Sequence, residues 1–152
     1  MTTILVTGSA GQLGSEIRER SVRFSGYNFI FTDTGELDIT DEGATAHFIS
    51  AAAPAWIVNC AAYTAVDRAE EEEQLATLIN GRGVENIVSA IRGTGCRLIH
   101  ISTDYVFDGS SPLPYTEDAA IAPASAYGRS KLAGEKAALA WHHTMVIRTS
   151  WL

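Results

Sequence analysis

Cysteine is scarce in this chain, with only two among 152 residues. Cys60 and Cys96 both stand inside apolar runs, which is typical of buried thiols in a reducing compartment and not of a disulfide framework. No apolar run approaches the roughly 20 residues that a membrane-spanning helix needs. The N-terminus shows neither a basic segment nor a small-residue cleavage site, so it does not read as a secretory signal. We therefore expect a cytoplasmic protein without a membrane partner.

Positive charge is also in short supply. Eleven Lys and Arg face 18 Asp and Glu, a net charge of −7, which argues against a nucleic-acid partner. The four histidines have no paired spacing with cysteines or carboxylates, so no metal site is predicted. A G-x-S-x-G elbow is missing, which makes a Ser-His-Asp hydrolase a poor fit. With 46% hydrophobic and 19% charged residues, the chain is expected to be globular.

What the sequence does contain is an alternation of short apolar runs and helical patterns. The near-continuous apolarity of the runs is typical of strands buried on both faces. Their alternation with helices predicts an α/β fold, a doubly wound parallel sheet of the Rossmann type with helices on both faces. The predicted strands are 3–7, 29–32, 56–60, 97–102 and 144–150, with a very short extra strand at 36–38, and the predicted helices are 12–23, 41–52, 68–92 and 126–140.

A glycine-rich stretch joins the first strand to the first helix. Its three glycines form G-x-x-G-x-x-G, a variant of the dinucleotide-binding fingerprint in the strand–loop–helix context that such a motif requires. Gly8 suits the tight turn, Gly11 lets the backbone approach a pyrophosphate, and Gly14 permits close packing of helix on strand. The helix N-terminus would attract the phosphates. The residues expected to bind cofactor here are Gly8, Ala10, Gly11, Gln12, Leu13 and Gly14.

The second strand ends at Asp33, about twenty residues past the loop, as an acidic partner of the adenosine ribose would. A carboxylate there accepts hydrogen bonds from the ribose hydroxyls and repels a 2′-phosphate. No Lys or Arg occurs between Arg23 and Arg68 to bind that phosphate, so NADH is favoured over NADPH. The alternative is that Asp33 only caps a turn. Asp38 and Ile39 are candidates to bracket the adenine.

Three residues downstream form the chemical centre of the prediction. Thr103 follows the fourth apolar run, and Tyr127 and Lys131 stand four apart near the start of the last helix. At that spacing the two side chains share a helix face. Thr103 would then hydrogen-bond a carbonyl oxygen, Tyr127 would protonate it, and Lys131 would hold the nicotinamide ribose and lower the pKa of the phenol. The alternative is a half-buried tyrosine beside a solvated lysine.

Longer stretches carry a resemblance to a known family. In this order the glycine motif, the hydroxyl and Tyr-x-x-x-Lys resemble the extended short-chain dehydrogenase/reductase superfamily. The stretches "ELDITD" (36–41), "NCAAYTAVDRAE" (59–70), "HISTDYVFDG" (100–109) and "YGRSKLAGE" (127–135) are similar to the dTDP-4-dehydrorhamnose reductases within it. The resemblance runs over essentially all 152 residues.

The resemblance implies reduction of the 4-keto group of dTDP-6-deoxy-L-lyxo-4-hexulose, a nucleotide sugar, by NADH or NADPH. Carried onto matching positions, it makes Thr103, Tyr127 and Lys131 the catalytic set. It further implies cofactor contacts from Ala61, Ala62, Tyr63 and Asn80, and sugar contacts from Thr64, Val66, Thr103 and Trp151. For Thr64, Val66 and Trp151, ordinary packing at the rim or in the core is an equally good reading.

The chain departs from that family in length, because members are about twice as long. We therefore expect residues 1–152 to be an NAD(P)-binding Rossmann domain that ends before the C-terminal substrate domain, which leaves its catalytic competence open. Two other functions remain open. One is a nucleotide-sugar epimerase or dehydratase, and the other is a non-catalytic regulatory subunit that binds NAD(P). The oligomeric state is also open, with a homodimer as one option.

Overall fold

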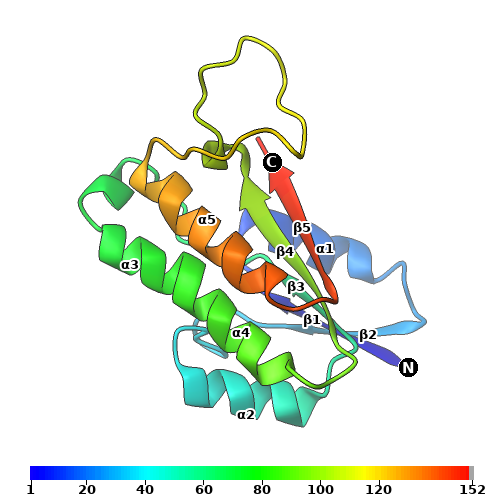
Figure 1. Cartoon of the computed structure of the whole chain (residues 1–152). Coiled ribbons are helices and arrows are strands. Elements are labelled where there is room, and N and C mark those ends of the chain that lie inside the picture. The colour runs from blue at the N-terminus through cyan, green and yellow to red at the C-terminus, as the bar shows by residue number, and fades with distance from the viewer. Residues whose placement is uncertain (151–152) are drawn as a thin grey trace.

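A five-stranded, all-parallel sheet forms the centre of the molecule, in the strand order β2-β1-β3-β4-β5 (Figure 1). The computed structural model describes residues 1–150, so the predicted contact of Trp151 lies outside the described residues. The five long strands of the prediction are confirmed, with ends that differ by one or two residues. They are β1 (Thr2–Thr7), β2 (Tyr27–Phe31), β3 (Trp56–Asn59), β4 (Arg97–Thr103) and β5 (Thr144–Thr149).

The extra strand predicted at 36–38 is wrong. Residues 34–36 form a turn, in which the carbonyl of Asp33 accepts from the N–H groups of Glu36 (3.0 Å) and Leu37 (2.8 Å). Asp33 also uses its side chain locally, because a carboxylate oxygen accepts from the N–H of Thr34 at 2.8 Å. Local bonding of this kind competes with a strand ladder and favours the turn.

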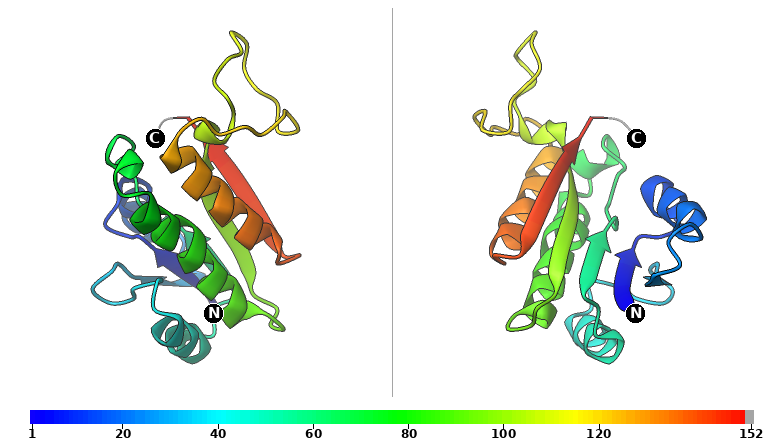
Figure 2. Two further views of the ribbon diagram at one scale, coloured as in Figure 1. Left: turned by 60° about the vertical axis from the view of Figure 1, so that its left-hand side comes forward. Right: turned by 90° about the vertical axis from the view of Figure 1, so that its right-hand side faces the viewer.

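Helices cover both faces of the sheet, unequally. The chain moves one way from β1 to β2 and then crosses back to β3, so right-handed crossovers place α1 and α2 on opposite faces. Figure 2 shows α1 alone beside β1, and α2, α4 and α5 together on the other side. The helices are α1 (Gln12–Ser21), α2 (Glu42–Ala52), α3 (Glu73–Thr77), α4 (Gly83–Ile91) and α5 (Ala126–Leu139). The doubly wound fold of the prediction is confirmed.

The single long helix predicted over 68–92 is interrupted in the structure. It contains the 3₁₀ turn η1 (Arg68–Glu70), then α3, then the π-helical turn η2 (Leu78–Arg82), which leads directly into α4. A π-turn inside a helix is rare and frequently marks a functional site. Here it places Asn80 in the interior, where the side chain is 1% exposed.

The hydrophobic core lies between the sheet and the layer formed by α2, α4 and α5. Leu5, Ile57 and Leu98 are register partners on three neighbouring strands and all are fully buried. They belong to one cluster with Ile87 and Ile91 of α4. On the opposite face, residues of the outer strand β5 are more open: Met145 is 58% and Ile147 39% exposed.

The topology also predicts where a ligand binds. β1 connects outward to β2, whereas its other neighbour, β3, leads on to β4 and β5. In open α/β sheets this reversal leaves a crevice beyond the carboxyl ends of the central strands, and ligands bind there. The glycine-rich loop after β1 and the turn η3 (Asp104–Val106) after β4 both lie at that edge.

We expect Gly134→Ala to lower the free energy of unfolding by about 1–3 kcal/mol, because overpacking forces backbone shifts. A Cβ atom at Gly134 would overlap the carbonyl oxygen of Asn80 and lie 3.1 Å from Nε2 of His100. Urea unfolding followed by circular dichroism measures the change. Gly43→Ala is the control, since its Cβ would meet only Oδ1 of Asp41 at 3.5 Å. Equal stability of Gly134→Ala and the parent would show that α5 does not need this close approach.

Candidate functional site: a dinucleotide crevice at the sheet edge

The glycine-rich loop is built by close backbone contacts. Gly8 has φ +63°, and a Cβ there would come within 2.5 Å of the backbone of Ala61. A Cβ at Gly14 would overlap Gly8 and lie 2.6 Å from Cα of Ser9, whereas one at Gly11 would meet only the Gly8 carbonyl oxygen at 3.3 Å. Gly8 and Gly14 are therefore required by packing inside the protein. Gly11 is exposed and lines the crevice.

The start of α1 offers a site for an anion. Gly11 is its N-cap residue and no side chain caps the helix there. Acidic residues are absent from the first turn, so no carboxylate of that turn offsets the positive end of the helix dipole. A helix N-terminus in this arrangement favours a phosphate group.

Asp33 joins the end of β2 to the loop. One carboxylate oxygen accepts from the N–H of Ala10 at 2.8 Å and the other from the N–H of Thr34 at 2.8 Å. These hydrogen bonds, with a smaller contribution from the positive charge of Arg18, hold the pKa of Asp33 below its ordinary value. The side chain is therefore a carboxylate at neutral pH and lines the crevice.

Arg18 is a residue that the sequence reasoning missed. It stands on α1, where its Nη2 donates to Oγ of Ser9 at 2.7 Å and its guanidinium lies 4.6 Å from the ring centroid of Phe31. In the sequence, no basic residue follows β2 before Arg68. Helix packing instead brings a cation from the preceding element to the same corner as Asp33.

The predicted adenine residues lie in the segment between β2 and α2. Asp38 accepts from the N–H and the hydroxyl of Thr40, at 2.9 and 2.7 Å, and Ile39 is 5% exposed. Asn86 of α4 donates to the carbonyl oxygens of Ile39 (2.9 Å) and Thr40 (3.1 Å). Asp38 and Ile39 both line the crevice, and Asn86 fixes the backbone of Ile39 and Thr40.

Thr103, Tyr127 and Lys131 come together where β4 ends against α5. Ser125 caps α5, accepting from the N–H of Gly128 at 3.0 Å, so Tyr127 is in the first turn and Lys131 one turn later. Oγ1 of Thr103 donates to Oδ1 of Asp104 and accepts from the N–H of Tyr105, both at 3.2 Å, and the Thr103 hydroxyl acts to lower the pKa of Tyr127. Lys131 is 3% exposed and its Nζ donates to the carbonyl oxygen of Ile101 at 2.7 Å.

Burial sets the protonation of this cluster. It lowers the pKa of Lys131 to about 8, while the carboxylate of Glu135 and the Cys60 thiol act to raise it. Burial raises the pKa of Tyr127, against the opposing effect of the Thr103 hydrogen bond. The sequence-based expectation that Lys131 lowers the pKa of the phenol is not met in this structure. The ammonium is directed to the backbone of β4, and Tyr127 is a neutral phenol at neutral pH.

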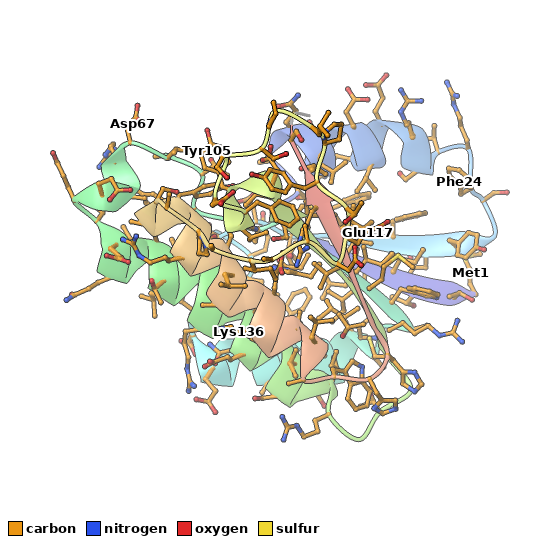
Figure 3. All side chains as sticks on the ribbon, turned by 45° about the horizontal axis from the view of Figure 1, so that its top comes forward. Met1, Phe24, Asp67, Tyr105, Glu117 and Lys136 are labelled. Atoms are coloured by element: carbon orange, nitrogen blue, oxygen red, sulfur yellow. The ribbon has the colours of Figure 1, made fainter. Side chains whose placement is uncertain are left out.

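The crevice has a volume of about 980 Å³ and collects most of the predicted residues. Those of the prediction that line it are Gly8, Ala10, Gly11, Gln12, Leu13, Gly14, Asp33, Asp38, Ile39, Ala61, Ala62, Thr64, Val66, Thr103, Tyr127 and Lys131. Further lining residues were not predicted, among them Cys60, Leu75, Leu78 and Tyr105. Tyr105, which Figure 3 labels, comes from η3. Its ring lies edge-on to that of Tyr127, with 5.5 Å between the ring centroids.

Tyr63 and Asn80 were predicted to contact the cofactor but are not among the residues that line the crevice. The Tyr63 hydroxyl donates to Glu72 at 2.5 Å. Asn80 accepts from the N–H of Tyr63 at 2.8 Å and donates to its carbonyl oxygen (3.1 Å) and to Oγ of Ser130 (2.9 Å). Asn80 therefore ties the segment after β3 to α5 from behind the crevice.

Two other features are absent from residues 1–150. No group of three or more His, Cys, Asp or Glu side chains in that range could hold a metal ion. Within the same range, no helix has both the length and the apolarity to cross a membrane.

Comparison with known proteins assigns a family to this arrangement. The family described as "RmlD substrate binding domain" matches residues 1–152. A curated relative from Streptomyces griseus, named dTDP-4-dehydrorhamnose reductase, is 43% identical over 150 residues, which are 97% of this chain and 49% of the relative. The chain spans about half the length of the curated relatives it matches.

Solved structures agree with this assignment. A dTDP-4-dehydrorhamnose reductase from Clostridium acetobutylicum superposes with a TM-score of 0.95 at 42% identity, covering 99% of this chain and 54% of that one. The enzyme of the same name from Bacillus anthracis, in complex with NADP, gives a TM-score of 0.95 at 38% identity with the same two coverages.

Proposed function

The chain belongs to the RmlD substrate binding domain family, and from this membership we propose that its crevice binds a nicotinamide dinucleotide and reduces the 4-keto group of dTDP-4-dehydro-L-rhamnose. The observation that carries the proposal is the meeting of Thr103, Tyr127 and Lys131 at the end of β4, in the same crevice as the glycine-rich loop. The product would be dTDP-L-rhamnose.

The residues present fit such a cofactor. The close-packed Gly8 and Gly14 bring the uncapped start of α1 to the crevice, and Gly11 leaves its backbone open to a pyrophosphate. Asp33 is ionised and retains lone pairs for ribose hydroxyls. Lys131 would bind the second ribose, and Ala61 and Ala62 would line the nicotinamide side. When bound, the nicotinamide supplies a hydride.

The side chains of the chain itself supply the acid. Burial keeps Tyr127 protonated, so it can donate its proton to the oxygen of a carbonyl group as that oxygen gains charge. Thr103 lines the same crevice as Tyr127 and would hold the same oxygen. Thr64 and Val66, which line the crevice, would face the sugar.

For the cofactor we propose NADH over NADPH, because the Asp33 carboxylate repels a 2′-phosphate. Arg18 opposes this preference, since its positive charge acts on Asp33. The relative from Bacillus anthracis is in complex with NADP. The preference therefore depends on the balance between one carboxylate and one guanidinium.

Two other functions are separated from this one by simple observations. A nucleotide-sugar epimerase or dehydratase would retain its cofactor through purification, whereas a reductase releases it and consumes NADH stoichiometrically. A non-catalytic regulatory subunit would co-purify with a larger enzyme. The presence of Thr103, Tyr127 and Lys131 in one crevice argues against the regulatory subunit. The stretches "TAVDRAE" (64–70) and "STDYVFDG" (102–109) favour the reductase over the epimerase or dehydratase.

We expect Gly11→Val to weaken NADH binding by tenfold or more, about 1.4 kcal/mol. A Cβ at this position is already 3.3 Å from the Gly8 carbonyl oxygen, and the added methyl groups would occupy the space of the pyrophosphate. Fluorescence titration with NADH measures the affinity. Gly26→Val is the control, because a Cβ there meets nothing within 4 Å. Unchanged affinity of Gly11→Val would disprove the phosphate-loop assignment.

The parent chain should bind NADH more tightly than NADPH, and Asp33→Asn should narrow the difference by about tenfold. The substitution removes the charge that repels a 2′-phosphate and keeps an oxygen that can accept from the Ala10 N–H. Parallel titrations with the two cofactors give the ratio. Equal affinities in the parent would refute the preference.

Tyr127→Phe should lower turnover by about 10²–10⁴-fold with little change in cofactor affinity, since only the proton donor is lost. Lys131→Met should weaken NADH binding and lower turnover together. Both are measured by NADH oxidation with the 4-keto sugar nucleotide, in a polypeptide of the relatives' length that carries this chain as its first half. Unimpaired turnover by Tyr127→Phe would remove the tyrosine from the mechanism.

The 152-residue chain alone should bind NADH but turn over the sugar nucleotide poorly.

A further inference from the structure

A second charged residue of α5 is buried one turn beyond Lys131. Glu135 is 1% exposed, and its carboxylate has three donors. Oγ of Ser102 donates to Oε1 at 2.6 Å, Nε of Arg148 donates to Oε1 at 2.8 Å, and Nη2 of Arg148 donates to Oε2 at 2.8 Å. This network joins α5 to both β4 and β5.

Arg148 also contacts residues between β4 and α5. Its Nη1 donates to the carbonyl oxygen of Glu117 at 3.1 Å, and its guanidinium lies 5.1 Å from the ring centroid of Phe107. Figure 3 labels Glu117, in the long loop that leads from β4 to α5. The bidentate geometry fixes the carboxylate in one orientation. A buried ion pair is poor evidence of added stability, because desolvation offsets the attraction. We therefore looked to the neighbouring Lys131, and not to stability, for the role of this network.

We propose that Glu135 is a positioning residue, fixed by Arg148 and Ser102, which keeps the neighbouring Lys131 protonated and aligned along β4. The proposal rests on the proposed function, in which Lys131 acts as an ammonium group. Glu135 follows Lys131 by four residues on one helix face. Ser102 and Ile101, which contact Glu135 and Lys131 respectively, are consecutive residues of β4.

The other titratable groups near Lys131 cannot do the same at neutral pH. Burial raises the pKa of Cys60, at the end of β3, to about 11, so it is a neutral thiol. Burial lowers the pKa of His100, on β4, to about 3, so it is a neutral imidazole. Tyr127, on α5, is a neutral phenol, because burial raises its pKa. Among the described residues, Glu135 is the carboxylate that raises the pKa of Lys131.

The sign of the effect follows from these charges. Burial depresses the pKa of Lys131 to about 8, so the ammonium form is lost as the pH rises through that value. Removing the Glu135 carboxylate would depress the pKa further. The ammonium form would then be lost at a lower pH, and cofactor binding that needs it would fail earlier on the way to alkaline pH.

The chain offers a direct measurement, because it contains only two lysines, Lys131 and Lys136. Lys136 is exposed and provides a reference signal. With lysine labelled with ¹³C at Cε, NMR follows each lysine across a pH titration. We expect Glu135→Gln to move the midpoint of Lys131 down by about 1 pH unit. Loosened packing would instead move it up, towards the value of an exposed lysine, and an upward or absent shift would overturn the proposal.

Glu73→Gln is the matched control. Glu73 also pairs with a residue of α5, Arg129, at 2.8 Å, but this ion pair is exposed. The Glu73→Gln variant should leave the titration midpoint of Lys131 unchanged. If Glu135→Gln fails to fold, the double variant Glu135→Gln/Arg148→Met replaces it in the titration. This variant leaves no unpaired cation and should still lower the titration midpoint of Lys131. A double variant that titrates like the parent would refute the proposal.

NADH titration separates this inference from the proposed function. In the parent, affinity should fall as the pH rises through about 8, and in Glu135→Gln the same fall should occur at lower pH. A parent chain that does not bind NADH would defeat the proposed function, while the lysine titration would still decide the role of Glu135.

Discussion

The close approach of α5 to backbone on two sides is the constraint on which the site depends. At Gly134 the helix lies against the backbone of Asn80 in the π-turn, and at Gly128 it lies against the carbonyl group of Tyr105 after β4. Side chains at either position would push the helix outward. Tyr127, Lys131 and Glu135 all stand on this helix, so their distances from β4 follow from the absence of two Cβ atoms.

Beneath the crevice, polar side chains cross the sheet where an apolar core would be expected. Oγ1 of Thr7 donates to Asn59 at 2.6 Å, and Nδ2 of Asn59 lies 3.1 Å from Nδ1 of His100. Asn59 also accepts from the N–H of Ala61 at 3.2 Å. The row links the carboxyl ends of β1 and β3 to the middle of β4. These buried hydrogen bonds position the strands that lead to the phosphate loop, although Nε2 of His100 has no hydrogen-bond partner among the described residues.

Patterns within short stretches of the sequence predicted the strands and the glycine-rich loop. The five apolar runs and the three spaced glycines sufficed for the parallel sheet and its phosphate loop. The strand proposed around Leu37 failed because side-chain and turn hydrogen bonds of Asp33 satisfy that backbone instead. The helix proposed over 68–92 failed at its middle, since periodicity does not show a π-turn.

Tertiary contacts determined what the sequence could not show. Arg18 stands 15 residues before Asp33 and Arg148 stands 13 residues after Glu135. Helix and strand packing brings the charge of Arg18 near Asp33 and pairs Arg148 with Glu135. The pKa of Tyr127 was expected to fall because a lysine stood four residues away. Burial, which spacing does not reveal, raises it instead. Asn80 was expected to contact the cofactor, but it does not line the crevice, and its hydrogen bonds hold the backbone of Tyr63 instead.

The partly exposed face of β5 has a consequence for the behaviour of the molecule in solution. Met145 and Ile147 expose apolar surface on an edge strand, and such surface attracts other molecules. A net charge of −7 opposes that attraction by mutual repulsion between molecules. Since dissolved ions weaken repulsion but leave apolar attraction intact or stronger, the colloidal stability of this polypeptide decreases as ionic strength rises. Dilute buffers of low salt are therefore the conditions under which it stays dispersed.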